Sequence, residues 1–128
     1  MKRILIAVTD QELRAHLRQE WANHCELVEA NSGAEAVYLA ATTQPDLVLV
    51  SIILDDVCGV EVIKASRHHN PGARVVALAR HGDIPAAAYA EMARAIGAHE
   101  ALVEPVRMPQ LQRHLLVGVA PHTNAATA

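Results

Sequence analysis

The sequence predicts an α/β domain in which a doubly wound, five-stranded parallel sheet lies between two layers of helices. Five short apolar segments, each long enough for one strand, alternate along the chain with five amphipathic segments of helical period. Aromatic residues make up only 2% of the chain and Phe is absent, so the core must consist of Ile, Val, Leu and Ala. Parallel strands joined by right-handed helical crossovers give the three-layer arrangement.

The amino-terminal part of the chain carries two strands and two helices. The apolar run Ile4–Val8 predicts the first strand, and Thr9-Asp10-Gln11-Glu12 has the S/T-x-x-E spacing of a capping box that begins a helix. Cys25–Ala30 predicts a short second strand. A second capping box, over residues 32–35, begins a helix that extends to about residue 42. The inward face of the first helix is expected to carry Leu13, Leu17 and Trp21.

The third strand is the predicted centre of the sheet. Pro45 blocks any continuation of the preceding helix, and Leu47–Val50 is an unbroken apolar run typical of a strand buried on both faces. The run ends at Ser51, beside a turn. Because α/β proteins place their sites at the carboxyl ends of such strands, Ser51 is the first candidate site residue.

The carboxyl-terminal half repeats the alternation. We expect Asp83 to cap the fourth helix, with Pro85 in its first turn, and Gly97 to end it. One domain is expected over residues 1–119, followed by a disordered tail over residues 120–128. The remaining predicted elements are a helix over Val60–His69, a strand over Arg74–Ala79, a strand over His99–Val103 and a helix over Met108–Val117 with Met108, Leu111 and Leu115 inward.

Composition narrows the classes of partner. The net charge is −3 and no Lys/Arg-rich run occurs, so we expect no nucleic-acid binding. The first apolar run is too short for a signal peptide or a membrane span, so a cytoplasmic location without membrane binding is expected. Cys25 and Cys58 are isolated and fall at opposite ends of the predicted sheet, which indicates neither a disulfide nor a CxxC site.

Four stretches of this sequence resemble the response-regulator receiver domain of two-component signalling. They are KRILIAVTDQELR, PDLVLVSIILDDVCGVEVIKASR, RVVALARHGD and GAHEALVEP, and the resemblance covers residues 2–118. It implies a flavodoxin-like receiver fold with strand order 2-1-3-4-5 and a site at the carboxyl end of the sheet. The partners it implies are a histidine kinase, an output protein or another response regulator.

The resemblance also implies that the phosphorylation pocket of this chain is degenerate. Receivers accept a phosphoryl group on an aspartate that ends the third strand, with an acidic pair for Mg²⁺, a switch hydroxyl, an aromatic residue and a lysine around it. Scaffold positions of the family are retained at Pro45-Asp46, Gly59, Gly97-Ala98 and Pro105. Carried over to this sequence, the acceptor falls on Ser51 and the acidic pair on Val8 and Thr9. The switch hydroxyl falls on Ala79, the aromatic residue on Ala101 and the lysine on Glu104.

These departures favour a pseudo-receiver that is not an enzyme and uses neither metal nor cofactor. Val8 and Thr9 supply no carboxylate for Mg²⁺, and Glu104 would face an incoming phosphate as a like charge. We therefore expect a signalling module of a two-component or phosphorelay pathway that acts by protein–protein interaction, independent of aspartyl phosphorylation. The alternative is a receiver-like regulator that responds to modification of Ser51 or to a small ligand in the altered pocket.

Other site chemistries are weaker readings of the same residues. Asp10 and the Asp55–Asp56 pair could replace the metal ligands, but a capping turn and solvated loop acids explain them better. The eight histidines show no metal-ligand spacing and are expected to be solvated. Ser51 lacks the glycines of a G-x-S-x-G elbow, and no glycine-rich phosphate loop follows the first strand.

The fourth helix and Arg80 are candidate interaction features. Receivers use the face of the fourth helix, fifth strand and fifth helix for output and dimerisation, so a homodimer through this face is expected. Arg80 is expected to pair with Glu104 or to cover the pocket toward Ser51 and Glu104; the alternative is that it points into solvent. We expect the inner side of the fourth helix to be a core stripe of Ile84, Ala88, Met92, Ala95 and Ile96. The other side is expected to be an apolar partner face of Ala86, Tyr89, Ala90 and Ala93. The alternative is that the alanines are present only because they favour helix and that Tyr89 is a lone exposed aromatic.

Overall fold

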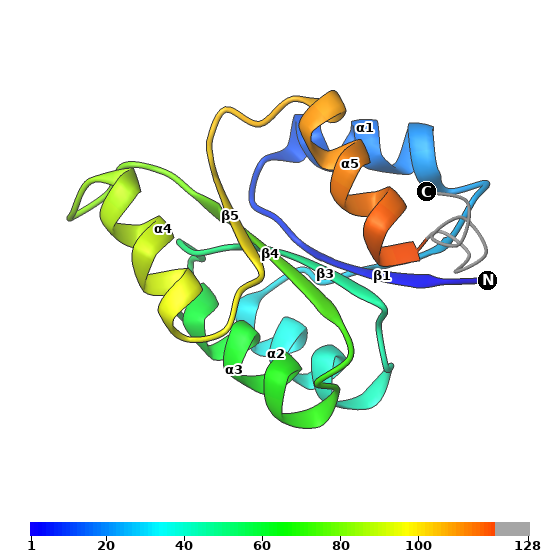
Figure 1. Ribbon diagram of the computed structural model, residues 1–128, viewed down its shortest axis with the longest axis horizontal. Coiled ribbons are helices and arrows are strands. Elements are labelled where there is room, and N and C mark those ends of the chain that lie inside the picture. The colour runs from blue at the N-terminus through cyan, green and yellow to red at the C-terminus, as the bar shows by residue number, and fades with distance from the viewer. Residues whose placement is uncertain (120–128) are drawn as a thin grey trace.

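Five parallel strands form one sheet in the order β2-β1-β3-β4-β5 in the computed structural model, which describes residues 1–119 and side chains as far as His114 (Figure 1). This order confirms the predicted flavodoxin-like topology. The strands are β1 Arg3–Ala7, β2 Glu26–Glu29, β3 Leu47–Ser51, β4 Arg74–Ala79 and β5 Glu100–Val103. The helices are α1 Gln11–Trp21, α2 Gly33–Thr42, α3 Gly59–His69, α4 Ala86–Ala95 and α5 Met108–Val119.

The sheet separates two apolar cores because successive strand residues point to opposite faces. In β1, Ile4 and Ile6 pack with α1 and α5, whereas Leu5 and Ala7 face α2, α3 and α4. Figure 1 shows the same division, with α1 and α5 on one side of the sheet and α2, α3 and α4 on the other. β3 pairs with both β1 and β4, and all of its residues are buried, as its unbroken apolar run predicts.

Two helix starts were predicted from capping boxes, and the structure supports one of them. At α2, the Ser32 hydroxyl accepts the N–H of Glu35 at 3.0 Å, while the Glu35 carboxylate accepts the N–H of Asn31. At α1, the cap is Asp10 rather than Thr9: its Oδ1 accepts the N–H groups of the second and third helical residues. Thr9 belongs instead to the site described below, where its backbone N–H donates to the side chain of Ser51 at the end of β3.

The orientation predicted for α4 is only partly right, because Met92 and Ile96 of the predicted core stripe pack against the core but other positions are exchanged. Ala93 is fully buried and Ala90 is nearly so, whereas Ile84 is 39% exposed and Ala95 is exposed. The helix begins at Ala86 after Pro85, without the predicted Asp83 cap. Its inner face meets a surface of alanines on β4 and β5, and small residues on both sides allow the helix to approach the sheet closely. The proposed partner face therefore loses Ala90 and Ala93, while Ala86 and Tyr89 are half-buried.

The carboxyl-terminal elements otherwise follow the prediction. Gly97 has a φ of 124°, a conformation that favours glycine, and it follows the end of α4. In α5, Leu111 is fully buried and Met108 packs partly against the same core, as expected. The Leu115 side chain and the tail over residues 120–128 lie outside the described parts. Among residues 1–119, no helix combines the length and the apolar character that a membrane crossing requires.

Candidate functional site

The centre of the site is a hydrogen bond between the ends of β1 and β3. Ser51, the last residue of β3, is 1% exposed, and its Oγ accepts the backbone N–H of Thr9 at 3.2 Å. The next N–H, that of Ile52, donates to the carbonyl of Leu78 on β4 at 3.0 Å. The predicted site residue therefore lies where expected, but its hydroxyl oxygen already binds the protein's own backbone.

Three of the pocket positions implied by the resemblance are apolar and buried. Val8 is buried in the core beneath α1, and Ala79 and Ala101 are buried in the core beneath α4. These side chains carry no group that could bind a metal or donate a hydrogen bond. Of the six pocket positions taken from the sequence, only Thr9, Ser51 and Glu104 present polar side chains.

Glu104 brings a negative charge to this edge of the sheet. Its backbone N–H donates to the carbonyl of Ala79 at 2.8 Å, which places it at the joint end of β4 and β5. Its Oε1 is buried and has no hydrogen-bond partner among the described residues. Burial raises the pKa of the Glu104 carboxyl, the positive charge of Arg80 opposes this, and the negative charge of Asp10 adds to it.

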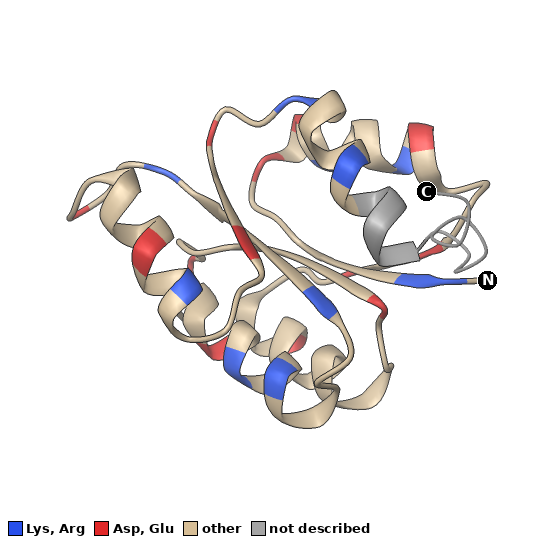
Figure 2. Cartoon of the chain, in the orientation of Figure 1, with Lys and Arg blue, Asp and Glu red and all other residues tan. Residues whose placement is uncertain are grey.

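Arg80 influences Glu104 without touching it. Its side chain is exposed, and the ion pairs within residues 1–119 do not include one between Arg80 and Glu104. In Figure 2 the segments after β1 and β5 carry acidic residues, and a basic one follows β4. The predicted ion pair is therefore wrong, although the positive charge lowers the pKa of Glu104 through space.

The two loop acids after β3 have different roles. Asp55 is exposed, as expected, but Asp56 holds the start of α2: its Oδ1 and Oδ2 accept the N–H groups of Gly33 and Ala34 at 2.8 and 2.9 Å. These bonds lower the pKa of Asp56. A Cβ on Gly33 would overlap Val57, so a glycine is needed for this close approach. A contact between residues 23 apart leaves no local signal in the sequence.

Beside this loop lies a buried arginine. Arg14 of α1 is 8% exposed, and its Nε and Nη2 lie 3.2 Å from Oε1 of Glu29. Its Nη1 donates to the carbonyl of Val8 at 3.2 Å, and the other Glu29 oxygen pairs with Arg18. Arg14 also lines a cavity of about 180 Å³ enclosed by the loops after β1, β2 and β3.

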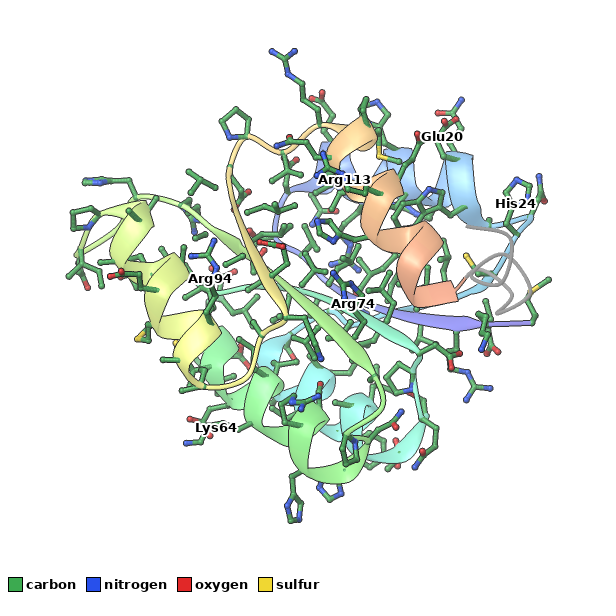
Figure 3. All side chains as sticks on the ribbon, in the orientation of Figure 1. Glu20, His24, Lys64, Arg74, Arg94 and Arg113 are labelled. Atoms are coloured by element: carbon green, nitrogen blue, oxygen red, sulfur yellow. The ribbon has the colours of Figure 1, made fainter. Side chains whose placement is uncertain are left out.

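The histidines of the described residues do not form a metal site. No group of three or more His, Cys, Asp or Glu side chains in the described residues could hold a metal ion. Six histidines are exposed as predicted, but His114 is only 6% exposed because α5 turns it toward β4. Its Nδ1 lies 3.4 Å from Nη2 of Arg74, the β4 residue labelled in Figure 3. His122 lies outside the described residues. His99 is exposed, yet its Nδ1 accepts the N–H of Val75 at 3.0 Å.

The parallel sheet in the order 2-1-3-4-5, with two helices on one face and three on the other and polar side chains at its carboxyl edge, defines a receiver-type α/β fold. The chain belongs to the response regulator receiver domain family, whose model matches residues 4–116. It is thus a receiver domain of a two-component response regulator.

Its relatives agree with this assignment. The chain is 32% identical to the polar-differentiation response regulator DivK of Brucella ovis over 117 residues, which cover 86% of this chain and 90% of DivK. Among solved structures, it is similar to a CheY-like receiver domain protein from Methanospirillum hungatei, with a TM-score of 0.74, 22% identity and coverage of 90% of both chains. A two-component response regulator from Clostridium difficile gives a TM-score of 0.76 at 20% identity, with coverage of 91% of this chain and 94% of the other.

Proposed function

We propose that this receiver domain signals by protein–protein interaction, without phosphorylation of an aspartate. The observation that carries the proposal is the state of the residue ending β3: a buried serine whose hydroxyl oxygen is bound by the N–H of Thr9. Receiver phosphorylation needs a carboxylate nucleophile that an incoming phosphoryl group can reach in line. Ser51 is neither charged nor accessible in this arrangement, and any ester it formed would lack the lability of an acyl phosphate.

The surroundings of Ser51 oppose phosphoryl transfer as well. Mg²⁺ is held by hard oxygen ligands, usually carboxylates, but Val8 is apolar and the carboxylate of Asp10 caps α1. Glu104 stands at the position that the resemblance gives to the lysine, so a carboxylate replaces the cation that would stabilise the transferred group. At about 4 Å and an effective dielectric constant near 20, the repulsion between two such negative charges is roughly 4 kcal/mol.

The proposed role is that of a binding module in a two-component or phosphorelay pathway, not of an enzyme, and it needs no cofactor. Its partners are a histidine kinase, an output protein or another response regulator. The net charge of −3 and the lack of a basic run support a protein partner rather than nucleic acid or a membrane surface. The proposed location is the cytoplasm.

The surface of α4, β5 and α5 is the proposed contact face, including contact with a second copy. Val103 of β5 is 49% exposed and Ile84 before α4 is 39% exposed, so apolar area remains on it after Ala90 and Ala93 are assigned to the core. Arg94 of α4 and Glu100 of β5 lie 3.9 Å apart and add a charged pair to this surface. Such a mixed surface resembles a transient interface.

Two measurements test the proposal. Wild-type protein is incubated with acetyl phosphate and Mg²⁺ and its intact mass is measured; no phosphate-sized shift is expected. The matched control carries Val8→Asp, Thr9→Asp, Ser51→Asp and Glu104→Lys, with its fold checked by circular dichroism, and should gain phosphate. A stoichiometric shift mapped to Ser51 in the wild type would overturn the proposal in favour of a modification-responsive regulator.

The interaction itself is tested by titration against purified histidine-kinase dimerisation domains. Binding should be the same with and without beryllium fluoride and Mg²⁺, which together mimic a phosphorylated carboxylate. Val103→Asp should weaken it, whereas Tyr38→Asp, also an exposed residue but on α2, should not. Affinity that depends on beryllium fluoride would contradict phosphorylation-independent action.

A further inference from the structure

The cavity beside the phosphorylation pocket lies at the topological switch point of the sheet. The chain builds outward from β1 to β2 on one side and from β3 to β4 and β5 on the other, so the order reverses between β1 and β3. In open α/β sheets, ligands bind in the crevice outside the carboxyl ends of the strands at this point. The cavity of about 180 Å³ is enclosed by the segments that follow β1, β2 and β3. Its lining includes Val8 and Thr9 but neither Ser51 nor Glu104.

One wall of the cavity carries a buried positive charge. Arg14 lines the cavity and has five N–H donors; Glu29 and the Val8 carbonyl take three of them, and the other two have no partner among the described residues. Glu29 is shared between Arg14 and Arg18, so this cluster of three side chains carries a net charge of +1. An acceptor with negative charge would complete both the hydrogen bonding and the charge balance of this wall.

The loop after β3 brings two acidic residues to the cavity lining. Asp55 is exposed at the cavity rim, and within residues 1–119 its carboxylate takes part in no hydrogen bond or ion pair. Asp56 lies next to it, already bound to the amino end of α2. A plain anion would be repelled by this side, and a plain cation would be repelled by Arg14. The distribution fits a molecule that carries both charges.

The walls are held in place before any ligand enters. Asp56 ties the loop after β3 to the start of α2 through two backbone N–H groups, and Val57 packs where Gly33 has no side chain. The guanidinium of Arg14 is fixed from two sides by Glu29 and the Val8 carbonyl. A preorganised site loses less entropy when a ligand binds, which favours affinity even for a small molecule.

We propose that this cavity binds a small zwitterion of the size of a free α-amino acid, with the ligand carboxylate on Arg14 and its ammonium group on Asp55. At roughly 30 Å³ per water molecule, the cavity holds the volume of about six waters, which matches a ligand of this size. Its apolar lining at Ala7, Ala30 and Leu54 provides room for a short aliphatic side chain. The site is separate from the protein-interaction function, and either can hold without the other.

The test titrates the ¹⁵N-labelled chain with pools of the twenty free L-amino acids and follows the backbone amide signals. Saturable shifts are expected at Asn31, Ser32 and Asp55. For the amino acid that binds, the N-acetyl derivative lacks the ammonium group and the carboxamide lacks the carboxylate, and both should bind at least about fivefold more weakly.

A matched pair of variants separates a specific site from general charge effects. Asp55→Asn should weaken binding about fivefold, whereas Asp83→Asn, which removes an exposed acid from the loop before α4, should leave it unchanged. The proposal is overturned if no pool gives saturable shifts, if the shifts lie away from the three loops, if both variants bind equally, or if the single-charge derivatives bind as well as the amino acid.

Discussion

Thr9 and Ser51, which are 42 residues apart, close the carboxyl edge of the sheet through one hydrogen bond from the Thr9 N–H to the Ser51 Oγ at 3.2 Å. The acceptor is 1% exposed, and the bond is partly shielded from water. Ser51→Ala leaves the N–H of Thr9 without a partner and should lower the free energy of unfolding by about 1–3 kcal/mol. Chemical denaturation measures this, with Ser32→Gly, a helix cap that costs only a few tenths of a kcal/mol, as the comparison. Equal losses in both variants would show that the Ser51 bond contributes little.

The buried pair of Arg14 and Glu29 should couple strongly. A double-mutant cycle with Arg14→Met and Glu29→Gln is expected to give a coupling energy of about 1–3 kcal/mol, because both groups lie largely out of water. The exposed pair of Lys64 and Glu61 on α3 is the control and should give less than about 0.5 kcal/mol. Both cycles are measured by denaturant unfolding. Equal coupling in the two pairs would mean that burial does not strengthen the Arg14 interaction.

Glu104 should reduce stability at neutral pH. Its pKa is raised in the folded state, chiefly by burial, so the native protein holds this proton more tightly than the unfolded chain does. Stability from this group is therefore lost as the pH rises from the ordinary carboxyl range through the raised pKa. Glu104→Gln should unfold at a higher denaturant concentration at neutral pH, and its advantage should vanish in acid.

Glu91→Gln is the control for this experiment, because Glu91 is exposed on α4. Its stability should parallel the wild type at every pH. If Glu104→Gln also paralleled the wild type, the Glu104 carboxylate would not be destabilised in the folded protein.

His99 and His114 should make the domain sensitive to weak acid. Partial burial of the His99 side chain lowers its pKa, and the positive charges of Arg67 and Arg74 lower it further. Burial of His114 lowers its pKa; the charges of Arg74 and Arg113 act in the same direction, and that of Glu100 opposes them. The unfolded chain then binds protons that the native state does not. The contribution of these two histidines to the free energy of unfolding is therefore complete above the ordinary histidine pKa of 6.5, and it is lost as the pH falls through their lowered pKa values in the folded protein.

The measurement is the unfolding free energy as a function of pH for the wild type and for the double variant His99→Gln, His114→Gln. The double variant should lose less stability between neutral and weakly acidic pH. His16→Gln, which removes an exposed histidine from α1, should retain the full wild-type pH dependence. A double variant with an unchanged slope would contradict the assignment to these two rings.

The inner face of α4 predicts opposite results at two alanines. Ala93→Leu adds bulk to a fully buried position against the sheet and should destabilise by about 1–3 kcal/mol. Ala95→Leu lies on the exposed side and should change stability by no more than about 0.5 kcal/mol. Thermal or chemical unfolding distinguishes the two. If Ala95→Leu destabilised the protein and Ala93→Leu did not, the side of α4 that carries Ala95 would be the inner one, as the sequence pattern alone favours.

The elements of the fold could be predicted from the sequence because their signals are local. An apolar run such as Leu47–Val50, blocked upstream by Pro45, predicts a buried strand wherever it occurs. The predicted Arg74–Ala79 strand matches β4 at both ends. Alternation of such runs with helical segments predicts a doubly wound parallel sheet with Ser51 at the end of a strand, whereas the order of the strands was implied by the resemblance to receiver domains.

The face of α4 and the details of the site were decided only by the tertiary structure. The spacing of alanines along α4 does not indicate which side of the helix meets the sheet. That side is set by packing against the alanines of β4 and β5. The partners of Thr9, Arg14 and Asp56 come from segments far along the chain, and no local rule connects them. The sequence by itself therefore determined the elements, the sheet and the residue at the end of β3. Folding determined which polar groups satisfy one another there, because hydrogen bonds between loops depend on distances that exist only after the core has packed.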